Sequence, residues 1–291
     1  MTRLIGSLAE VAGRYDAVYC DLWGCLHDGR AAFPEAVAAL RAFRAGGGRV
    51  VLVTNSPRPR PAVLRQLARL GVPDDCWDDM ASSGDAAQAA LAAGAVGRRV
   101  WHLGPETDGS FFTETAEDIA GLDRIERTRF EDAEGIVCTG LFDDATETPE
   151  DYRGRLMLAK QRGLPMLCAN PDIVVDFGDR RVWCAGALAE FYVELGGRAF
   201  WFGKPHPPIY DLAARRLERL AGGPVEPGRI LAIGDGVATD VAGAAGEGID
   251  ALFVTGGLAA GDLGAAPEGA AVSAWLAERN AAPRYAIHRL G

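Results

Sequence analysis

Two short apolar runs in this sequence each end in an aspartate that a glycine closely follows. We predict strands over residues 16–21 and 229–233, which lead to Asp21 and Asp235. Continuous apolar runs of this length are typical of strands that are buried on both faces of a parallel sheet. A charged group at the tip of such a strand is costly to bury unless it binds something. The sequence therefore favours a parallel α/β sheet with an acidic site at one edge.

The order of the predicted elements is typical of a doubly wound parallel sheet with a second, smaller α/β domain inserted into it. In the N-terminal part we predict a helix, a strand and a helix over residues 34–44, 49–54 and 59–70. A smaller α/β block follows, in which we expect helices from about residue 83 to 93, over residues 113–120 and over about residues 149–162. From about residue 186 the first alternation resumes. We therefore predict a core domain of residues 1–79 and 185–291 and an inserted domain of residues 80–184.

Polar side chains stand where three of the predicted strands end. Asp21 and Asp235 each end a strand, and Thr54 ends another. Ligands of open α/β sheets bind beyond the carboxyl ends of the strands, where the strand order reverses. If the first strand is central, the three side chains converge, and the two carboxylates need a cation. The carboxylate oxygens of Asp21 and Asp235 are suitable ligands for Mg²⁺, and Lys204 adds a positive charge that is suited to phosphate.

Four short motifs in this order resemble those of the haloacid dehalogenase-like (HAD) hydrolases. They are Asp21-x-x-Gly24, Thr54-Asn55, Gly203-Lys204-Pro205-x-Pro207 and Gly234-Asp235-Gly236-x-x-Thr239-Asp240. The Thr54-Asn55 pair, the Asn170-Pro171-Asp172 triplet and the place of the insertion are similar to subfamily IIA. That subfamily includes nitrophenyl phosphatases and nucleotide phosphatases. The resemblance covers residues 14–275 and implies a Rossmann-like core with an inserted cap domain.

The resemblance also implies roles for the motif residues. It makes Asp21 the nucleophile, which forms an aspartyl-phosphate. Thr54 and Lys204 are implied to be catalytic as well, because they stabilise the phosphoryl group. The residues implied to bind the substrate and its phosphate are Thr54, Asn55, Lys204 and Asn170. The residues implied to hold Mg²⁺ are Asp21, Trp23 through its backbone carbonyl, Asp235 and Asp240, the last directly or through water. The implied enzyme is a Mg²⁺-dependent phosphatase of a small phosphorylated metabolite, with a cap that selects the leaving group.

Trp23 departs from the family pattern, which has an aspartate at this position. That aspartate protonates the leaving oxygen and later activates water, and an indole N–H cannot act as an acid near neutral pH. General acid–base catalysis is typically worth about 10²–10⁴-fold in rate. Three nearby residues are candidates for a replacement acid: His27, Asp28 and His206. We therefore expect slow turnover, or turnover restricted to good leaving groups, unless one of them replaces the acid.

Other functions for the same motifs stay open. One is a protein that binds a phosphorylated ligand and barely turns it over, on a degenerate HAD scaffold. Another is a different HAD reaction, although a phosphonatase would need a Schiff-base lysine and the inserted domain contains only Lys160. A response regulator is disfavoured because its receiver domain has no large insertion. A dinucleotide oxidoreductase is disfavoured because no GxGxxG sequence follows the first strand.

Charge and composition limit the partners. The chain has 291 residues and a net charge of −10, from 40 acidic and 30 basic residues, which disfavours a nucleic-acid partner. No run approaches the roughly 20 apolar residues that span a bilayer. Six cysteines without a CxxC pair indicate reduced thiols, so we expect a cytoplasmic protein with no membrane partner. The family resemblance also suggests a homodimer formed through the cap.

Overall fold

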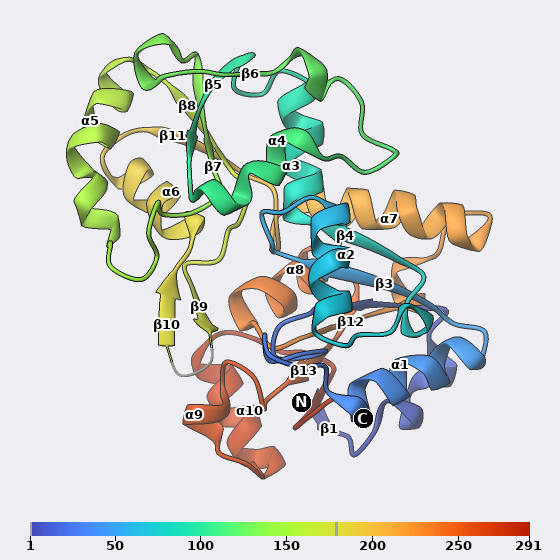
Figure 1. Ribbon diagram of the computed structural model, residues 1–291. Helices are drawn as coiled ribbons and strands as arrows, with labels where there is room; N and C mark the ends of the chain where they lie inside the picture. Colours follow the sequence, from blue (N-terminus) through green and yellow to red (C-terminus); the bar gives the residue numbers. More distant parts are fainter. Residues whose placement is uncertain (1, 178–179) are drawn as a thin grey trace. The chain divides into compact units, whose positions relative to one another are not determined.

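The computed structural model describes residues 2–177 and 180–291, and Figure 1 labels its helices and strands. Contacts within the chain divide it into two compact units. The first unit consists of Met1–Thr54, Gln66–Ala81 and Tyr210–Gly291. The second unit consists of Asn55–Arg65 and Ser82–Ile209. Each unit contains its own parallel sheet.

The first unit is built on a seven-stranded sheet with the order β1-β14-β13-β12-β2-β3-β4 in the described residues. Its strands are β1 (Arg3–Leu4), β2 (Ala17–Cys20), β3 (Arg49–Thr54), β4 (Asp79–Ser82), β12 (Ile230–Gly234), β13 (Asp250–Val254) and β14 (Tyr285–Ile287). β2 pairs in parallel with β3 on one side and with β12 on the other. All residues of β2 and β12 are buried, as expected of strands that are covered on both faces. The predicted central position of the first motif strand is confirmed.

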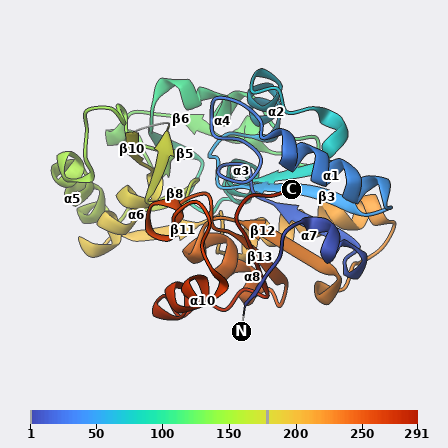
Figure 2. The ribbon, with the colours of Figure 1, turned by 90° about the horizontal axis from the view of Figure 1, so that it is seen from below.

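Helices cover both faces of this sheet. Figures 1 and 2 show α1 (Pro34–Ala45) and α8 (Ala242–Gly246) on opposite faces. α1 begins with a proline, which suits a first helical turn, and its buried residues lie on one helix face because they recur every three or four positions. The other helices of this unit are α2 (Arg60–Arg69), α7 (Pro207–Ala221), α9 (Ala260–Leu263) and α10 (Gly269–Glu278). Residues 60–65, which are more than half of α2, and residues 207–209 at the start of α7 belong to the second unit.

The second unit contains a five-stranded parallel sheet with the order β11-β8-β7-β5-β6. Its strands are β5 (Arg99–Leu103), β6 (Glu126–Arg127), β7 (Gly135–Cys138), β8 (Pro165–Cys168) and β11 (Arg198–Trp201). An antiparallel pair is formed by β9 (Val174–Phe177) and β10 (Arg180–Trp183). The helices are α3 (Ser83–Ala92), α4 (Ser110–Thr113), α5 (Arg153–Gln161) and α6 (Ala185–Glu194). Within the described ranges, no helix of either unit is both long enough and apolar enough to cross a membrane.

Contacts within the chain group residues 185–209 with the second unit, whereas the predicted domain bounds, which stay a prediction, assign them to the core domain. α6 contributes Leu188 and Tyr192 to the hydrophobic core of the second unit, and β11 pairs with β8. β11 is only four residues long, and a run this short gives little periodicity to detect. The assignment of the two units as a catalytic core and an inserted cap stays a prediction.

The predicted helix over residues 113–120 is wrong. The chain forms a short helix that ends at Thr113, and the residues that follow are not helical. The side-chain amide of Gln88, which is buried on α3, donates hydrogen bonds to the carbonyl oxygens of Phe111 and Glu114, at 2.8 and 2.7 Å. These tertiary contacts fix the end of the short helix and override the local helix propensity of the residues that follow.

Candidate active site

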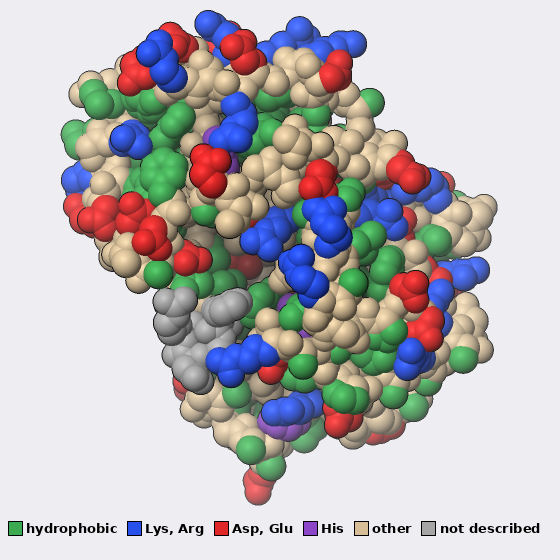
Figure 3. Space-filling model, in the orientation of Figure 1, with side chains coloured by type: hydrophobic (Ala, Val, Ile, Leu, Met, Phe, Trp, Pro, Cys, Tyr) green, Lys and Arg blue, Asp and Glu red, His purple; other side chains and the backbone are tan. Residues whose placement is uncertain are grey.

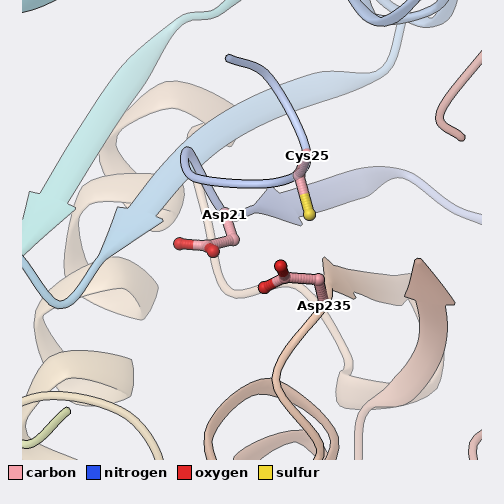
Figure 4. Close-up of side chains that lie close together, drawn as sticks. All are labelled: Asp21, Cys25 and Asp235. Carbon is pink, nitrogen blue, oxygen red and sulfur yellow. The ribbon is translucent and has the colours of Figure 1, made fainter. Parts of the chain in front are cut away.

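Two carboxylates meet at the carboxyl edge of the first unit's sheet. Asp21 directly follows β2 and Asp235 directly follows the neighbouring strand β12, and these residues are only 8% and 7% exposed. Figure 4 shows the two side chains beside each other beyond the ends of their strands. One oxygen of each carboxylate and the Cys25 sulfur all lie within 4.8 Å of one another. The predicted convergence of the two acids is therefore confirmed, while their roles stay predictions.

The donor chemistry of this acidic pair fits a hard divalent cation. Two like charges at this distance destabilise each other unless a cation or a proton intervenes, and burial strengthens the repulsion. Mg²⁺ prefers oxygen ligands and is commonly held by one or two carboxylates together with water and substrate phosphate. Asp235 is oriented by the backbone N–H of Leu258, which donates to its Oδ2 at 2.9 Å. Asp21 and Asp235 are thus suitable Mg²⁺ ligands.

Cys25 is the member of this group that the sequence did not single out. It lies in a turn of residues 22–27 that is closed by backbone hydrogen bonds of 2.8 to 3.0 Å. Gly24 has a φ of +70° there, and a Cβ at this position would overlap the Asp235 carboxylate, so the turn requires glycine. Burial, followed by the charges of Asp235 and Asp21, raises the pKa of the Cys25 thiol well above its usual value. The thiol is therefore neutral and a poor ligand for a hard cation.

Asp240 is buried in a π-helical turn, Val237–Val241, that follows β12. Its Oδ2 accepts hydrogen bonds from the backbone N–H of Gly236 and from the hydroxyl of Thr239, both at 3.2 Å. Among the residues that the structure describes, it does not belong to the close group of two carboxylates and one thiol. Its predicted contact with Mg²⁺, direct or through water, stays a prediction, as does the contact of the Trp23 carbonyl.

Thr54 ends β3, the strand beside β2, and is buried at 2% exposure. The register pairs Cys20 of β2 with Leu52 of β3. Because the two strands are parallel, Thr54 and Asp21 leave the sheet at the same edge, as the sequence pattern predicted. The donation of the Thr54 hydroxyl to a phosphoryl oxygen stays a prediction.

The other predicted phosphate-binding residues belong to the second unit, where a buried network joins them. The Asn55 Oδ1 accepts from the backbone N–H of Lys204 at 2.6 Å, and its Nδ2 donates to the carbonyl of the same residue at 3.1 Å. The Asn55 Nδ2 also donates to Asp172 Oδ1 at 2.8 Å. The backbone N–H of Asp172 in turn donates to Asn170 Oδ1 at 3.0 Å. Three distant segments are thereby fixed to one another, while the roles of these side chains in phosphate binding stay predictions.

The Trp23 side chain packs within its own loop. Its ring meets the His27 ring edge-on, with centroids 5.1 Å apart and planes at 74°. The backbone of Gly29 lies directly against the same indole, since a Cβ there would overlap it. The half-buried indole therefore has a clear packing role in this loop, and it offers no proton that a leaving oxygen can use.

The three predicted substitutes for the missing acid are poorly suited to that role. His27 is fully buried, and burial lowers its pKa to about 4, so its ring is neutral at pH 7. Asp28 accepts hydrogen bonds of 2.8 Å from the backbone N–H groups of Ala31 and Arg30, which lower its pKa and keep it ionised. His206 belongs to the second unit, and burial lowers its pKa as well. None of the three holds a dissociable proton at neutral pH.

Comparison with known proteins agrees with the sequence motifs. Residues 18–116 match a family model described as haloacid dehalogenase-like hydrolase, and residues 201–278 match one described as HAD-hydrolase-like. Chronophin from Bos taurus is 29% identical to this chain, and the alignment covers 82% of this chain and 81% of chronophin.

Two solved structures resemble the whole chain or most of it. A hydrolase of the haloacid dehalogenase-like family from Brucella suis is 43% identical, with a TM-score of 0.86 and coverage of 99% of this chain and 100% of that chain. A glycerol phosphate phosphatase from Mycobacterium tuberculosis, solved in complex with magnesium, is 25% identical and has a TM-score of 0.65. That match covers 87% of this chain and 71% of the other.

Proposed function

The chain belongs to the haloacid dehalogenase-like hydrolase family and is a hydrolase, and from this premise we propose that it is a Mg²⁺-dependent phosphohydrolase of a small phosphorylated metabolite. The observation that carries the proposal is the buried pair of Asp21 and Asp235 at the carboxyl edge of the sheet. A carboxylate beside a cation-binding carboxylate is suited to attack a phosphoryl group. The magnesium in the related glycerol phosphate phosphatase supports the choice of cation.

Asp21 is the proposed nucleophile. One of its carboxylate oxygens forms a bond to phosphorus while the bond from phosphorus to the leaving oxygen breaks, and the electron pair of that bond goes to the leaving oxygen. Water then forms a bond to the phosphorus of the aspartyl-phosphate, the bond to the Asp21 oxygen breaks, and phosphate is released while a proton goes to solvent. When bound, Mg²⁺ offsets the repulsion between carboxylate and phosphate.

The leaving group must depart without help from position 23. A weakly basic leaving oxygen, such as a nitrophenolate, needs no proton in the transition state. An alkoxide does need one, and neither His27 nor Asp28, which lie near Trp23 in the sequence, holds a proton to give at neutral pH. General acid–base help is worth about 10²–10⁴-fold in rate, so we infer that this protein acts on good leaving groups or acts slowly.

A second candidate function is the binding of a phosphorylated ligand without turnover. The observation that favours it is again Trp23, because the same residue that removes the acid also removes the group that activates water for the second step. The two candidate functions differ in whether Asp21 becomes phosphorylated and whether the aspartyl-phosphate is then hydrolysed.

The test compares 4-nitrophenyl phosphate with glycerol phosphate in the presence of Mg²⁺, and with EDTA as the metal-free control. We expect turnover of the nitrophenyl ester that Asp21→Asn abolishes, and an acid-quenched phosphoryl adduct on the peptide that contains Asp21. Trp23→Asp should raise the turnover of glycerol phosphate by about 10²-fold or more, and the matched variant Trp23→Phe should not. Saturable phosphate binding with no turnover above the Asp21→Asn variant would establish the binding function instead.

A further inference from the structure

A cavity in the second unit is lined by none of the residues assigned above to phosphoryl transfer. Its volume is about 530 Å³, within the range of about 300–1,000 Å³ that is usual for small-molecule sites. It is lined by Trp101, His102, Glu106, Arg127, Thr128, Arg129 and Phe142. These residues come from the middle and carboxyl end of β5, from the carboxyl end of β6, and from the segments that follow β5, β6 and β7.

The topology of the sheet favours a ligand at this place. The chain runs from β5 outward to the edge strand β6 and then returns to β7 on the other side of β5. The strand order therefore reverses at β5. Open α/β sheets bind ligands beyond the carboxyl ends of the strands at such a point.

Arg127 is a cation that is held in position at this cavity. Its guanidinium lies over the Phe112 ring, 5.0 Å from the ring centroid, and its Nη2 donates to Nδ1 of His102 at 3.3 Å. The acid beside it is Glu106, whose oxygen is 3.8 Å away and whose side chain is 92% exposed. This distance is beyond a hydrogen bond, and exposed pairs contribute little. The guanidinium therefore keeps donors for an anion.

His102 fixes this arrangement without adding a charge. Its Nε2 and the Thr139 hydroxyl are 2.9 Å apart. Because Arg127 donates to Nδ1, the ring proton lies on Nε2, which donates to the Thr139 oxygen. Burial, together with the charge of Arg127, lowers the pKa of His102 to about 4, so the ring is neutral at pH 7. His102 serves as a wall and as an acceptor for the arginine.

Aromatic rings form another part of the cavity. The Trp101 and Phe142 rings meet at 67° with centroids 6.1 Å apart, and 39% of the Phe142 residue is exposed. Figure 3 shows hydrophobic side chains bordered by basic and acidic ones on the surface over β5, β7 and α5. Aromatic surface beside a fixed guanidinium suits a flat ring that carries a negative charge.

We propose that this cavity binds a planar aromatic anion, that is, an aromatic ring with a carboxylate or phosphate substituent. The guanidinium of Arg155 lies over the Trp101 and Phe142 rings, 5.4 and 5.9 Å from their centroids. The ligand ring packs against the surface of Trp101 and Phe142 that Arg155 leaves uncovered, and the anionic group accepts hydrogen bonds from Arg127. Arg129 also lines this opening, and its charge is offset by Asp132, with which it pairs at 2.9 Å. The proposal goes beyond the hydrolase activity, because it needs neither the acidic pair nor a phosphoryl transfer.

The test uses 2-naphthoate, which carries no phosphoryl group, in calorimetric titrations of the full chain with EDTA present. We expect saturable binding that Arg127→Gln weakens about tenfold or more, since a charge-assisted hydrogen bond is lost. Phe142→Leu, a change at an exposed ring, should weaken binding as well. Arg124→Gln is the matched control, because Arg124 is an exposed arginine of the same unit that does not line the cavity.

Neutral 2-naphthamide separates the contribution of ligand charge to the affinity from that of ligand shape. It should bind the parent protein about tenfold more weakly than 2-naphthoate, and the two compounds should bind Arg127→Gln alike. Circular dichroism checks that each variant is folded. The proposal is overturned if 2-naphthoate does not bind, if both compounds bind the parent equally, or if neither Arg127→Gln nor Phe142→Leu changes the affinity. Because no outcome depends on turnover, a failure here is distinct from a failure of the phosphohydrolase proposal.

Discussion

Acidification is expected to destabilise this protein through His102, because the ring is neutral where it is buried. Its pKa is lowered from 6.5 to about 4 in the folded protein, chiefly by burial and also by the Arg127 charge. In the unfolded chain the ring takes up a proton as the pH falls below about 6.5, and in the folded protein it does so only near pH 4. The unfolded state binds more protons in this window, so the free energy of unfolding falls as the pH is lowered from 6.5 to about 4. Below about pH 4 the contribution of His102 to the free energy of unfolding no longer changes with pH.

The magnitude follows from the two pKa values. The interval between 6.5 and about 4 corresponds to at most about 3 kcal/mol, which is reached below pH 4. Between pH 7 and pH 5 the loss is about 2 kcal/mol. The structural cause is that a protonated ring would place a second positive charge beside Arg127, whose Nη2 is 3.3 Å from Nδ1, and would remove the acceptor of that arginine.

His102→Gln isolates this contribution, because an amide keeps a donor for Thr139 and takes up no proton in this range. Urea unfolding followed by circular dichroism at pH 7, 6 and 5 gives the free energy of unfolding for both proteins. The parent should lose about 2 kcal/mol more than the variant between pH 7 and pH 5. His27, whose pKa is also about 4, is present in both proteins and cancels in the difference. Equal losses in the two proteins would refute the reasoning.

Two further substitutions test the carboxyl edge and the network of the second unit. Gly24→Ala should weaken Mg²⁺ binding about tenfold or more in calorimetric titrations, because residue 24 has a φ of +70° and the new Cβ would overlap the Asp235 carboxylate. Gly13→Ala is the control, because a Cβ there meets open space. Equal Mg²⁺ affinities of the two variants would contradict the prediction. Asn55→Ala should lower the free energy of unfolding by about 2–4 kcal/mol in urea, because the backbone N–H and carbonyl of buried Lys204 lose their bonds to its amide. A loss below about 0.5 kcal/mol would show that the network is not needed for stability.

The central strands could be predicted from the sequence, but the short outer ones could not. β2, β3 and β12 are apolar runs that end in a polar motif, and both features are visible in the sequence. β1 has two residues and β14 has three, which is too few for any periodicity to emerge. Their place in the sheet follows from pairing with β13 and with each other, and such pairing depends on the tertiary fold.

The acidic pair could likewise be predicted, whereas its sulfur neighbour could not. Asp21 and Asp235 follow strand ends, and the topology of a parallel sheet brings strand ends together. The position of Cys25 depends instead on the positive φ of Gly24 in the turn that carries it. The cavity of the second unit was missed for a similar reason, since its lining residues come from three strand ends with no common spacing.

The Asp235 carboxylate lies in a slot between Gly24 and Gly257, and a Cβ on either glycine would overlap it. The slot is wide enough for the carboxylate only because neither glycine carries a Cβ. Every substitution of Gly24 or Gly257 adds side-chain atoms, so a mutation at either position can narrow the slot but cannot widen it. Mutant libraries built to give this hydrolase new substrates should therefore keep both glycines unchanged and vary other positions.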